Sequence, residues 1–219
     1  MTEFVYLHGF ASGPSSKKAS AFKNKFKEIG VSLNTPDLEG GNFENMTLTS
    51  QVNIVLDLLD QFQCKKVCLI GSSMGGYLAT LVAQRRVEIK ATYLMAPGFN
   101  FLERWMRSLK LDYDDETCWD PKIQVFHYRY DETKYIRTDI FKDAKNWNTL
   151  DLNREIPFRI VHGTHDEVVP IDESKKFVSR RPWCSLKELD SDHGLLSHLE
   201  WVVDDCMAFF KRLGILSTE

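Results

Sequence analysis

The amino-acid sequence predicts an α/β fold, in which a mainly parallel sheet of about six strands is flanked by helices. Short apolar runs typical of buried strands alternate with amphipathic stretches of helical period along the 219 residues. This alternation is typical of β-α-β units. No internal repeat or low-complexity tract is present, and only one long segment departs from the pattern. We therefore expect one domain spanning residues 1–219, with functional residues on the loops at the strand ends.

The individual elements follow from the spacing of apolar residues. Short apolar runs predict strands at residues 4–7, 31–35, 67–70, 91–95, 158–161 and 186–189. Apolar residues three and four positions apart predict helices at residues 17–29, 49–62, 74–84 and 196–213. Gly30 follows the first helix as a C′ glycine. Pro36 and Pro97 close the second and fourth strands.

Residues 98–152 break the alternation, because they separate two predicted strands by far more than one helix and its loops. This segment of 55 residues holds eleven of the 26 aromatic residues, which makes it too apolar for a flexible linker. We expect a lid insertion packed over a pocket above the strand ends. Most of its rings are expected to form a small core of their own. Phe99, Phe101 and Trp105 lie nearest the strand end and are predicted to line the pocket.

Composition and charge argue against several classes of protein. A net charge of -3 gives no electrostatic basis for binding nucleic acid or an anionic membrane surface. No apolar stretch approaches the length of a membrane span, and the first residues show no signal-peptide pattern. The five cysteines form no C-x-x-C pair and indicate reduced thiols in a cytoplasmic protein. Cys64 and Cys68 are interpreted as buried thiols rather than a metal pair, because Cys68 lies in a predicted strand.

A nucleophile motif follows the third predicted strand. Residues 71–75 read Gly-Ser-Ser-Met-Gly and match G-x-S-x-G, in which a sharp strand-to-helix turn exposes one serine. The crowded turn requires small residues two positions to either side of that serine, and Gly71 and Gly75 meet this requirement. Gly76 gives the following helix room to pack. The motif selects Ser73 as the candidate nucleophile.

A serine hydroxyl needs a histidine to take its proton and a carboxylate to orient that histidine. In this architecture the order along the chain is serine, acid, histidine. Asp166 lies in the loop after the fifth predicted strand, and His193 lies in the loop after the sixth. Order and placement both fit, so Ser73, Asp166 and His193 are the predicted catalytic residues.

Neighbouring side chains offer alternatives to these assignments. Glu167 is a second candidate for the acid. Asp190 and Asp192 also lie near the histidine, but loop aspartates usually bond to their own backbone. His198 is interpreted as a surface or packing residue of the last helix.

A metal site is a further alternative at His162, His165 and Asp166. Ligands so close together, with no second histidine and acid cluster, would form a poor cage for a metal ion. We therefore expect no metal and no organic cofactor.

An oxyanion hole requires backbone N–H groups that point at the attacked carbonyl oxygen. One is expected from Met74, which directly follows the nucleophile. The other is expected from Phe10 in the loop after the first strand, where Gly9 lets the backbone turn close to the pocket. His8 precedes this turn and is predicted to orient the loop by hydrogen bonding.

Four sequence segments then form a recognisable set: Tyr-Leu-His-Gly-Phe at residues 6–10, Gly-Ser-Ser-Met-Gly-Gly-Tyr-Leu-Ala-Thr at 71–80, Asp-Glu-Val at 166–168 and Asp-His at 192–193. Together they resemble the YqiA-type esterases of the α/β-hydrolase superfamily. The resemblance implies an α/β-hydrolase fold with a lid insertion. It also implies an esterase or thioesterase that acts on small-molecule or acyl esters through the three predicted catalytic residues.

Two other functions stay open from the sequence. The same three residues would serve a serine peptidase or aminopeptidase-like amide hydrolase. A non-catalytic binding module is disfavoured, since all three catalytic positions are filled. Residues 98–152 hold nine Lys and Arg against eleven Asp and Glu, so no basic cradle for coenzyme A phosphates stands out. The motifs specify neither the leaving group nor the oligomeric state.

Overall fold

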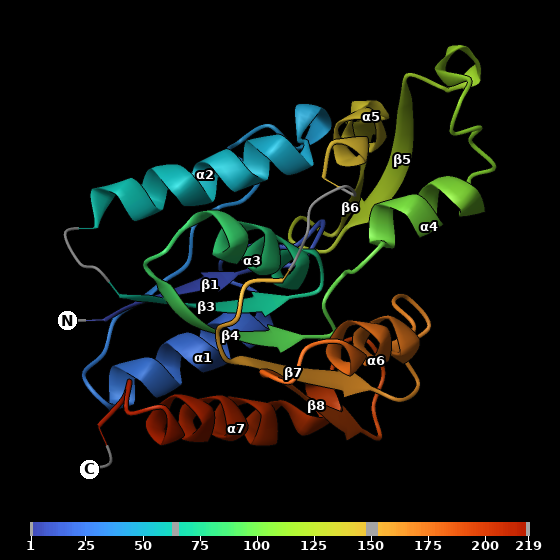
Figure 1. The fold of residues 1–219 in the computed structure, drawn as a ribbon. Helices are drawn as coiled ribbons and strands as arrows, with labels where there is room; N and C mark the ends of the chain where they lie inside the picture. The colour runs from blue at the N-terminus through green and yellow to red at the C-terminus, as the bar shows by residue number, and fades with distance from the viewer. Residues whose placement is uncertain (1, 63–65, 148–152, 218–219) are drawn as a thin grey trace.

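Six parallel strands form the main sheet of the described chain, in the order β2-β1-β3-β4-β7-β8 (Figure 1). The structure is a computed structural model that describes residues 2–62, 66–147 and 153–217. The strands are β1 (Glu3–Leu7), β2 (Leu33–Asn34), β3 (Val67–Ser72), β4 (Ile89–Met95), β7 (Phe158–Gly163) and β8 (Cys184–Leu189). All six predicted strands are present, and the predicted fold class is confirmed.

The sheet separates two hydrophobic cores. On β1, Phe4 and Tyr6 enter one core while Val5 and Leu7 enter the other, as the two-residue period of a strand requires. Helices α1 and α7 cover the first face, and α2 and α3 cover the second (Figure 1). Their bounds are α1 (Lys17–Glu28), α2 (Leu48–Gln61), α3 (Met74–Arg85) and α7 (Leu199–Arg212). Burial on both faces explains why the inner strands β1, β3 and β4 read as apolar runs.

Local side chains fix the ends of the first two of these helices. The hydroxyl of Ser16 accepts a hydrogen bond from Ala19 N–H at the start of α1. Gly30 has a φ of 68° and follows α1 as the predicted C′ glycine. Thr47 and Ser50 form a capping box at the start of α2. Such caps satisfy N–H groups that the first turn of a helix leaves without a partner.

The apolar pattern did not predict α6 (Ile171–Ser179), which packs against β7 and β8. Short 3₁₀ turns complete the connections at η1 (Phe43–Asn45), η2 (Glu116–Cys118) and η3 (Leu196–His198). Within the described residues, no helix combines the length and the apolar character needed to cross a membrane.

The insertion between β4 and β7 is described over residues 98–147, and its predicted end at residue 152 lies outside the described residues. It contains α4 (Phe101–Ser108), β5 (Lys122–His127), β6 (Glu132–Arg137) and α5 (Asp139–Lys145). Strands β5 and β6 pair as an antiparallel hairpin, which the sequence did not predict. Trp119, Phe141 and Trp147 are buried. Trp147 Nε1 donates to Thr49 Oγ1 at 2.9 Å, which ties the insertion to α2.

Three cysteines, Cys68, Cys184 and Cys206, are buried free thiols. Burial raises the pKa of the Cys68 and Cys184 thiols to about 12. These thiols are therefore protonated and unreactive near neutral pH, in agreement with the interpretation of Cys68. Cys64 lies outside the described residues.

Candidate active site

Ser73 sits between β3 and α3 in a strained backbone conformation, with φ 54° and ψ -120°. Two glycines make the turn possible by close approach. A Cβ on Gly71 would lie 2.5 Å from the carbonyl oxygen of Gly75, and a Cβ on Gly75 would lie 2.1 Å from that of Leu7. Any larger residue at either position would therefore collide with main chain. Strain of this kind persists only where the surroundings enforce it, and it clusters at functional sites.

Three side chains from three strand-end loops form one hydrogen-bonded chain. His193 Nε2 lies 2.9 Å from Ser73 Oγ, and His193 Nδ1 lies 2.7 Å from Asp166 Oδ2. Ser73 follows β3, Asp166 follows β7 and His193 follows β8. The structure thus brings together the three residues that the sequence predicted as catalytic.

The Asp166 carboxylate is buried and receives four hydrogen bonds. Besides His193, His162 Nε2 lies 3.0 Å from Oδ2, while the N–H groups of Val168 and Val169 donate to Oδ1. Burial alone would raise the pKa of this carboxyl, but the hydrogen bonds from His162 and His193 outweigh burial and hold the pKa well below its usual range. Asp166 is therefore a fixed anion beside His193.

His162 is a contact of Asp166 that the sequence did not predict. Its side chain is fully buried. Its Nε2 also lies 2.8 Å from the Val169 carbonyl oxygen, and its Nδ1 lies 2.8 Å from Ser174 Oγ on α6. Nε2–H therefore donates to Asp166 and Val169, and Nδ1 accepts from the serine hydroxyl. His162, a candidate metal ligand in the sequence, thus links Asp166 to Ser174 on α6 through hydrogen bonds.

Replacing His162 by leucine is expected to lower the free energy of unfolding by about 1–3 kcal/mol, because Ser174 and Asp166 lose a buried partner. We expect kcat to fall about 10- to 100-fold as the acid shifts. Urea unfolding and ester hydrolysis would measure both effects. His165→Leu is the matched control, since His165 pairs with Asp190 at an exposed position and should change stability by less than about 0.5 kcal/mol. Equal effects of the two variants would contradict this role for His162.

The alternative acids and base lie outside this chain of contacts. Glu167 is exposed. Asp190 Oδ1 lies 2.7 Å from His165 Nε2, and Asp192 Oδ1 accepts from the Leu195 N–H. His198 pairs with the neighbouring Ser197. Within the described ranges, no group of three or more His, Cys, Asp or Glu side chains is arranged to hold a metal ion.

The loop after β1 lies directly against the nucleophile. A Cβ on Gly9 would be 3.3 Å from Ser73 Cβ, so this glycine allows the close approach. His8 is buried; its Nδ1–H donates to the Gly9 carbonyl and its Nε2 accepts from the Leu38 N–H, at 2.9 and 3.1 Å. Burial lowers the pKa of His8, which favours the neutral ring that this pattern of hydrogen bonds requires. His8 therefore orients the loop.

The two residues predicted to supply oxyanion N–H groups are neighbours of the nucleophile turn. Met74 is the first residue of α3, so its N–H has no acceptor within the helix. Phe10 follows Gly9 in the loop against Ser73. In the part of the chain that the structure describes, neither N–H donates to a backbone carbonyl oxygen of a turn, loop or cap.

The predicted pocket residues fall into two places. Phe99 stacks on Phe177 at 4.4 Å between ring centroids. Phe101 and Trp105 stack on each other and contact the Phe10 ring, with centroid distances to Phe10 of 6.0 and 5.2 Å. The first pair borders a cavity beside α6, and the second group packs against the side chain of Phe10.

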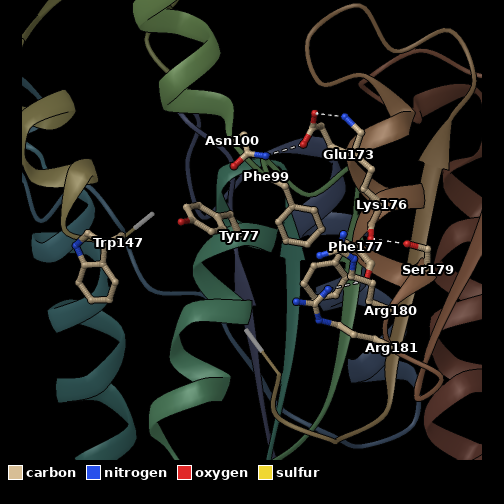
Figure 2. A pocket seen from close by; sticks show the side chains of 10 residues that line it. All are labelled: Tyr77, Phe99, Asn100, Trp147, Glu173, Lys176, Phe177, Ser179, Arg180 and Arg181. Carbon is tan, nitrogen blue, oxygen red and sulfur yellow. Dashed lines mark hydrogen bonds and ion pairs between the residues drawn. The ribbon is translucent and has the colours of Figure 1, made fainter. Parts of the chain in front are cut away.

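Figure 2 shows the cavity, of about 390 Å³, between α3, α6 and the start of the insertion. Aromatic side chains form one part of its wall and charged or polar side chains the rest. Its lining residues are Tyr77, Phe99, Asn100, Trp147, Glu173, Lys176, Phe177, Ser179, Arg180 and Arg181. Phe99 is the predicted pocket residue that lines it, and neither Ser73, Asp166 nor His193 does so.

A parallel sheet with a serine turn after β3, an acid loop after β7 and a histidine loop after β8 defines the class of α/β-hydrolases. The chain matches the model of the uncharacterised protein family UPF0227 over residues 3–211 and belongs to that family. This is the family of YqiA-type esterases, so the resemblance noted in the sequence is confirmed.

Curated relatives and solved structures agree with this class. A Mycoplasma genitalium protein with the provisional name esterase/lipase 2 is 38% identical over 205 residues, covering 81% of this chain and 76% of the relative. The human mitochondrial palmitoyl-protein thioesterase ABHD10 is 24% identical over 188 residues, covering 80% of this chain and 60% of the relative. Est1E from Butyrivibrio proteoclasticus, solved with ferulic acid, has the same fold with a TM-score of 0.81 at 23% identity, covering 97% of this chain and 89% of that one. By homology the chain is an α/β-hydrolase of the esterase, lipase and thioesterase type.

Proposed function

We propose that this protein is a serine hydrolase that cleaves carboxylic esters or thioesters of acyl substrates through an acyl-enzyme on Ser73. The observation that carries the proposal is the continuous contact from Ser73 Oγ through His193 to Asp166, at 2.9 and 2.7 Å. Such a chain converts a weak alcohol nucleophile into an effective one. The low pKa of Asp166 keeps a negative charge beside His193 as that ring becomes cationic.

The reaction takes place in two halves. His193 Nε2 takes the proton of Ser73 Oγ as the oxygen attacks the substrate carbonyl carbon. The N–H groups of Phe10 and Met74 bind the oxygen of the tetrahedral intermediate. His193 then gives its proton to the departing alcohol or thiol, which leaves an ester between Ser73 and the acyl group. In the second half, a water molecule attacks the acyl carbonyl carbon while His193 Nε2 takes its proton. His193 then returns the proton to Ser73 Oγ, which releases the carboxylic acid and restores the Ser73 hydroxyl.

The named relatives support acyl esters and thioesters as the substrate class. ABHD10 is named as a palmitoyl-protein thioesterase, and Est1E was solved with an aromatic acid. The aromatic cluster of Phe10, Phe101 and Trp105 beside the proposed oxyanion hole would accommodate an apolar acyl group. Amide hydrolysis and ligand binding without catalysis are the alternatives.

Labelling with a fluorophosphonate probe and a substrate panel test the proposal together. We expect one phosphonyl group per chain, located on Ser73 by peptide mass spectrometry. We expect turnover of p-nitrophenyl and acyl thioesters to exceed that of aminoacyl amides. A folded protein that reacts with no phosphonate would favour the non-catalytic alternative, and faster amide turnover would favour a peptidase.

Replacing Phe10 by proline should lower kcat about 10²- to 10³-fold, because proline lacks the N–H that binds the oxyanion. KM should change little, since the lost hydrogen bond forms mainly in the transition state. Phe10→Ala is the matched control, because it removes the same ring but keeps the N–H. Equal kcat values for two folded variants would remove Phe10 from the proposed oxyanion hole.

A further inference from the structure

Two segments that are distant in the sequence contact the proposed oxyanion loop (residues 8–11). One is the segment 37–39 after β2, and the other is the tip of the β5–β6 hairpin (residues 127–131). The Tyr128 N–H donates to the Ala11 carbonyl oxygen at 2.9 Å, so the hairpin tip bonds directly to the loop that carries the Phe10 N–H.

The hairpin tip is also anchored to the segment 37–39. His127 Nε2 lies 2.6 Å from Glu39 Oε1, and the two side chains are 0% and 4% exposed. Arg129 forms an ion pair with Asp37, also at 2.6 Å. A buried polar pair has one low-energy arrangement, because either group would lose a hydrogen bond on moving. The hairpin tip is therefore fixed in position relative to residues 37–39.

The same segment fixes the other end of the oxyanion loop. The Leu38 N–H donates to His8 Nε2, and His8 Nδ1–H donates to the Gly9 carbonyl. Phe10 thus lies between two tethers, with His8 on one side and Ala11 on the other. The partner of His8 is Leu38, next to Glu39, and the partner of Ala11 is Tyr128, next to His127. The hydrogen bond between Glu39 and His127 therefore links the two tethers.

Aromatic ring contacts connect the same segments as these hydrogen bonds. The Phe43 ring lies 5.6 Å from Phe10 and 4.5 Å from His127, measured between centroids. The Phe10 ring also contacts Trp105 from α4. Elements of the insertion therefore pack around the residue whose N–H would bind the oxyanion.

We infer that the hairpin tip, through Tyr128 N–H and the His127–Glu39 pair, is a positioning element that holds the Phe10 N–H in its oxyanion-binding orientation. This inference rests on the proposed function and adds a role for the insertion besides covering a pocket. A misplacement of about 1 Å in such a donor can lower the rate about 10²-fold. Tyr128, His127 and Glu39 act on the reaction through the loop and do not contact the reacting atoms.

Tyr128 offers a clean test, because its side chain is 75% exposed while its N–H makes the contact. Tyr128→Pro removes the N–H, and Tyr128→Ala keeps it. We expect Tyr128→Pro to lower kcat about tenfold or more relative to Tyr128→Ala, with KM and the kcat–pH profile unchanged. A fluorophosphonate should still label all of the Tyr128→Pro protein at long times, but more slowly. Loss of folded protein would instead reduce the final extent of labelling.

Glu39 provides a second, independent test. Glu39→Gln keeps an acceptor for His127 Nε2–H, whereas Glu39→Leu removes it. We expect Glu39→Leu to lose kcat and Glu39→Gln to restore most of it. Gln124→Ala is the control for a general disturbance of the hairpin, since Gln124 bonds Tyr135 away from the tip; it should behave as the unmodified protein.

The outcomes separate the two proposals. If the unmodified protein neither labels nor hydrolyses esters, the proposed function is wrong. If it does both, and folded Tyr128→Pro matches Tyr128→Ala in kcat, the positioning role is overturned. If Tyr128→Pro does not fold, the role stands or falls with Glu39→Gln and Glu39→Leu, and equal kcat values for these two would overturn it.

Discussion

Ser73→Ala is expected to lower kcat for ester hydrolysis at least about 10⁴-fold, because no other group can form the acyl-enzyme. The proposed oxyanion hole and substrate contacts would persist and leave a small residual rate over water. KM should stay close to its original value, since the lost hydroxyl contributes mainly to the transition state. The measurement is steady-state hydrolysis of a short p-nitrophenyl ester, with fluorophosphonate labelling on the same preparation.

The neighbouring serine supplies the control for Ser73→Ala. Ser72 is buried as the last residue of β3, so its hydroxyl is not expected to act as a nucleophile. Ser72→Ala should therefore still label to one phosphonyl group per chain. Ester hydrolysis that survives Ser73→Ala within about tenfold would exclude the acyl-enzyme mechanism, because removal of a serine nucleophile costs far more than that.

The sequence predicted the sheet well, because the inner strands β1, β3, β4 and β7 are mostly buried, largely apolar segments bounded by loop residues. It missed α6 since only Ser174 and Phe177 of that helix are buried, and two residues do not make a recognisable apolar face. It missed the β5–β6 hairpin for a different reason. At the hairpin tip the polar His127 is fully buried while the apolar Phe126 is 49% exposed, so the usual in-and-out alternation of polarity is reversed.

The candidate site was predictable where it depends on local motifs. Ser73, Asp166 and His193 each follow a strand, and parallel strands bring such loops to one edge of the sheet. Contacts between distant residues were not predictable in this way. His162 is braced by Ser174 on the missed helix, and Glu39 is paired with His127 on the missed hairpin. Their partners depend on elements whose existence the apolar pattern did not reveal.

Asp166→Asn should reduce kcat about 10⁴-fold while the fold is retained, because an amide cannot hold His193 as the carboxylate does. Asp166 Oδ2 accepts hydrogen bonds from both His193 and His162, and Oδ1 accepts two more from backbone N–H groups. An asparagine has only one acceptor oxygen. Its NH₂ group must therefore face either the two histidines or the two backbone N–H groups, all of which are donors to Asp166. If it faces His193, the Nδ1–H tautomer is no longer favoured, and Nε2 loses its capacity as a base toward Ser73.

The same substitution should change how stability depends on pH. The pKa of Asp166 in the folded protein lies below its ordinary value of about 3.9. The charged carboxylate therefore stabilises the fold fully above that value, and this contribution is lost as the pH falls through and below it. Between pH 7 and pH 3 the unmodified protein should lose more unfolding free energy than Asp166→Asn, in urea titrations at each pH. Asp190→Asn, at an exposed loop position, should follow the unmodified protein. Parallel plots of unfolding free energy against pH for all three proteins would mean that the hydrogen bonds to Asp166 do not favour its charged form. The proposed mechanism could then no longer rely on a fixed anion beside His193.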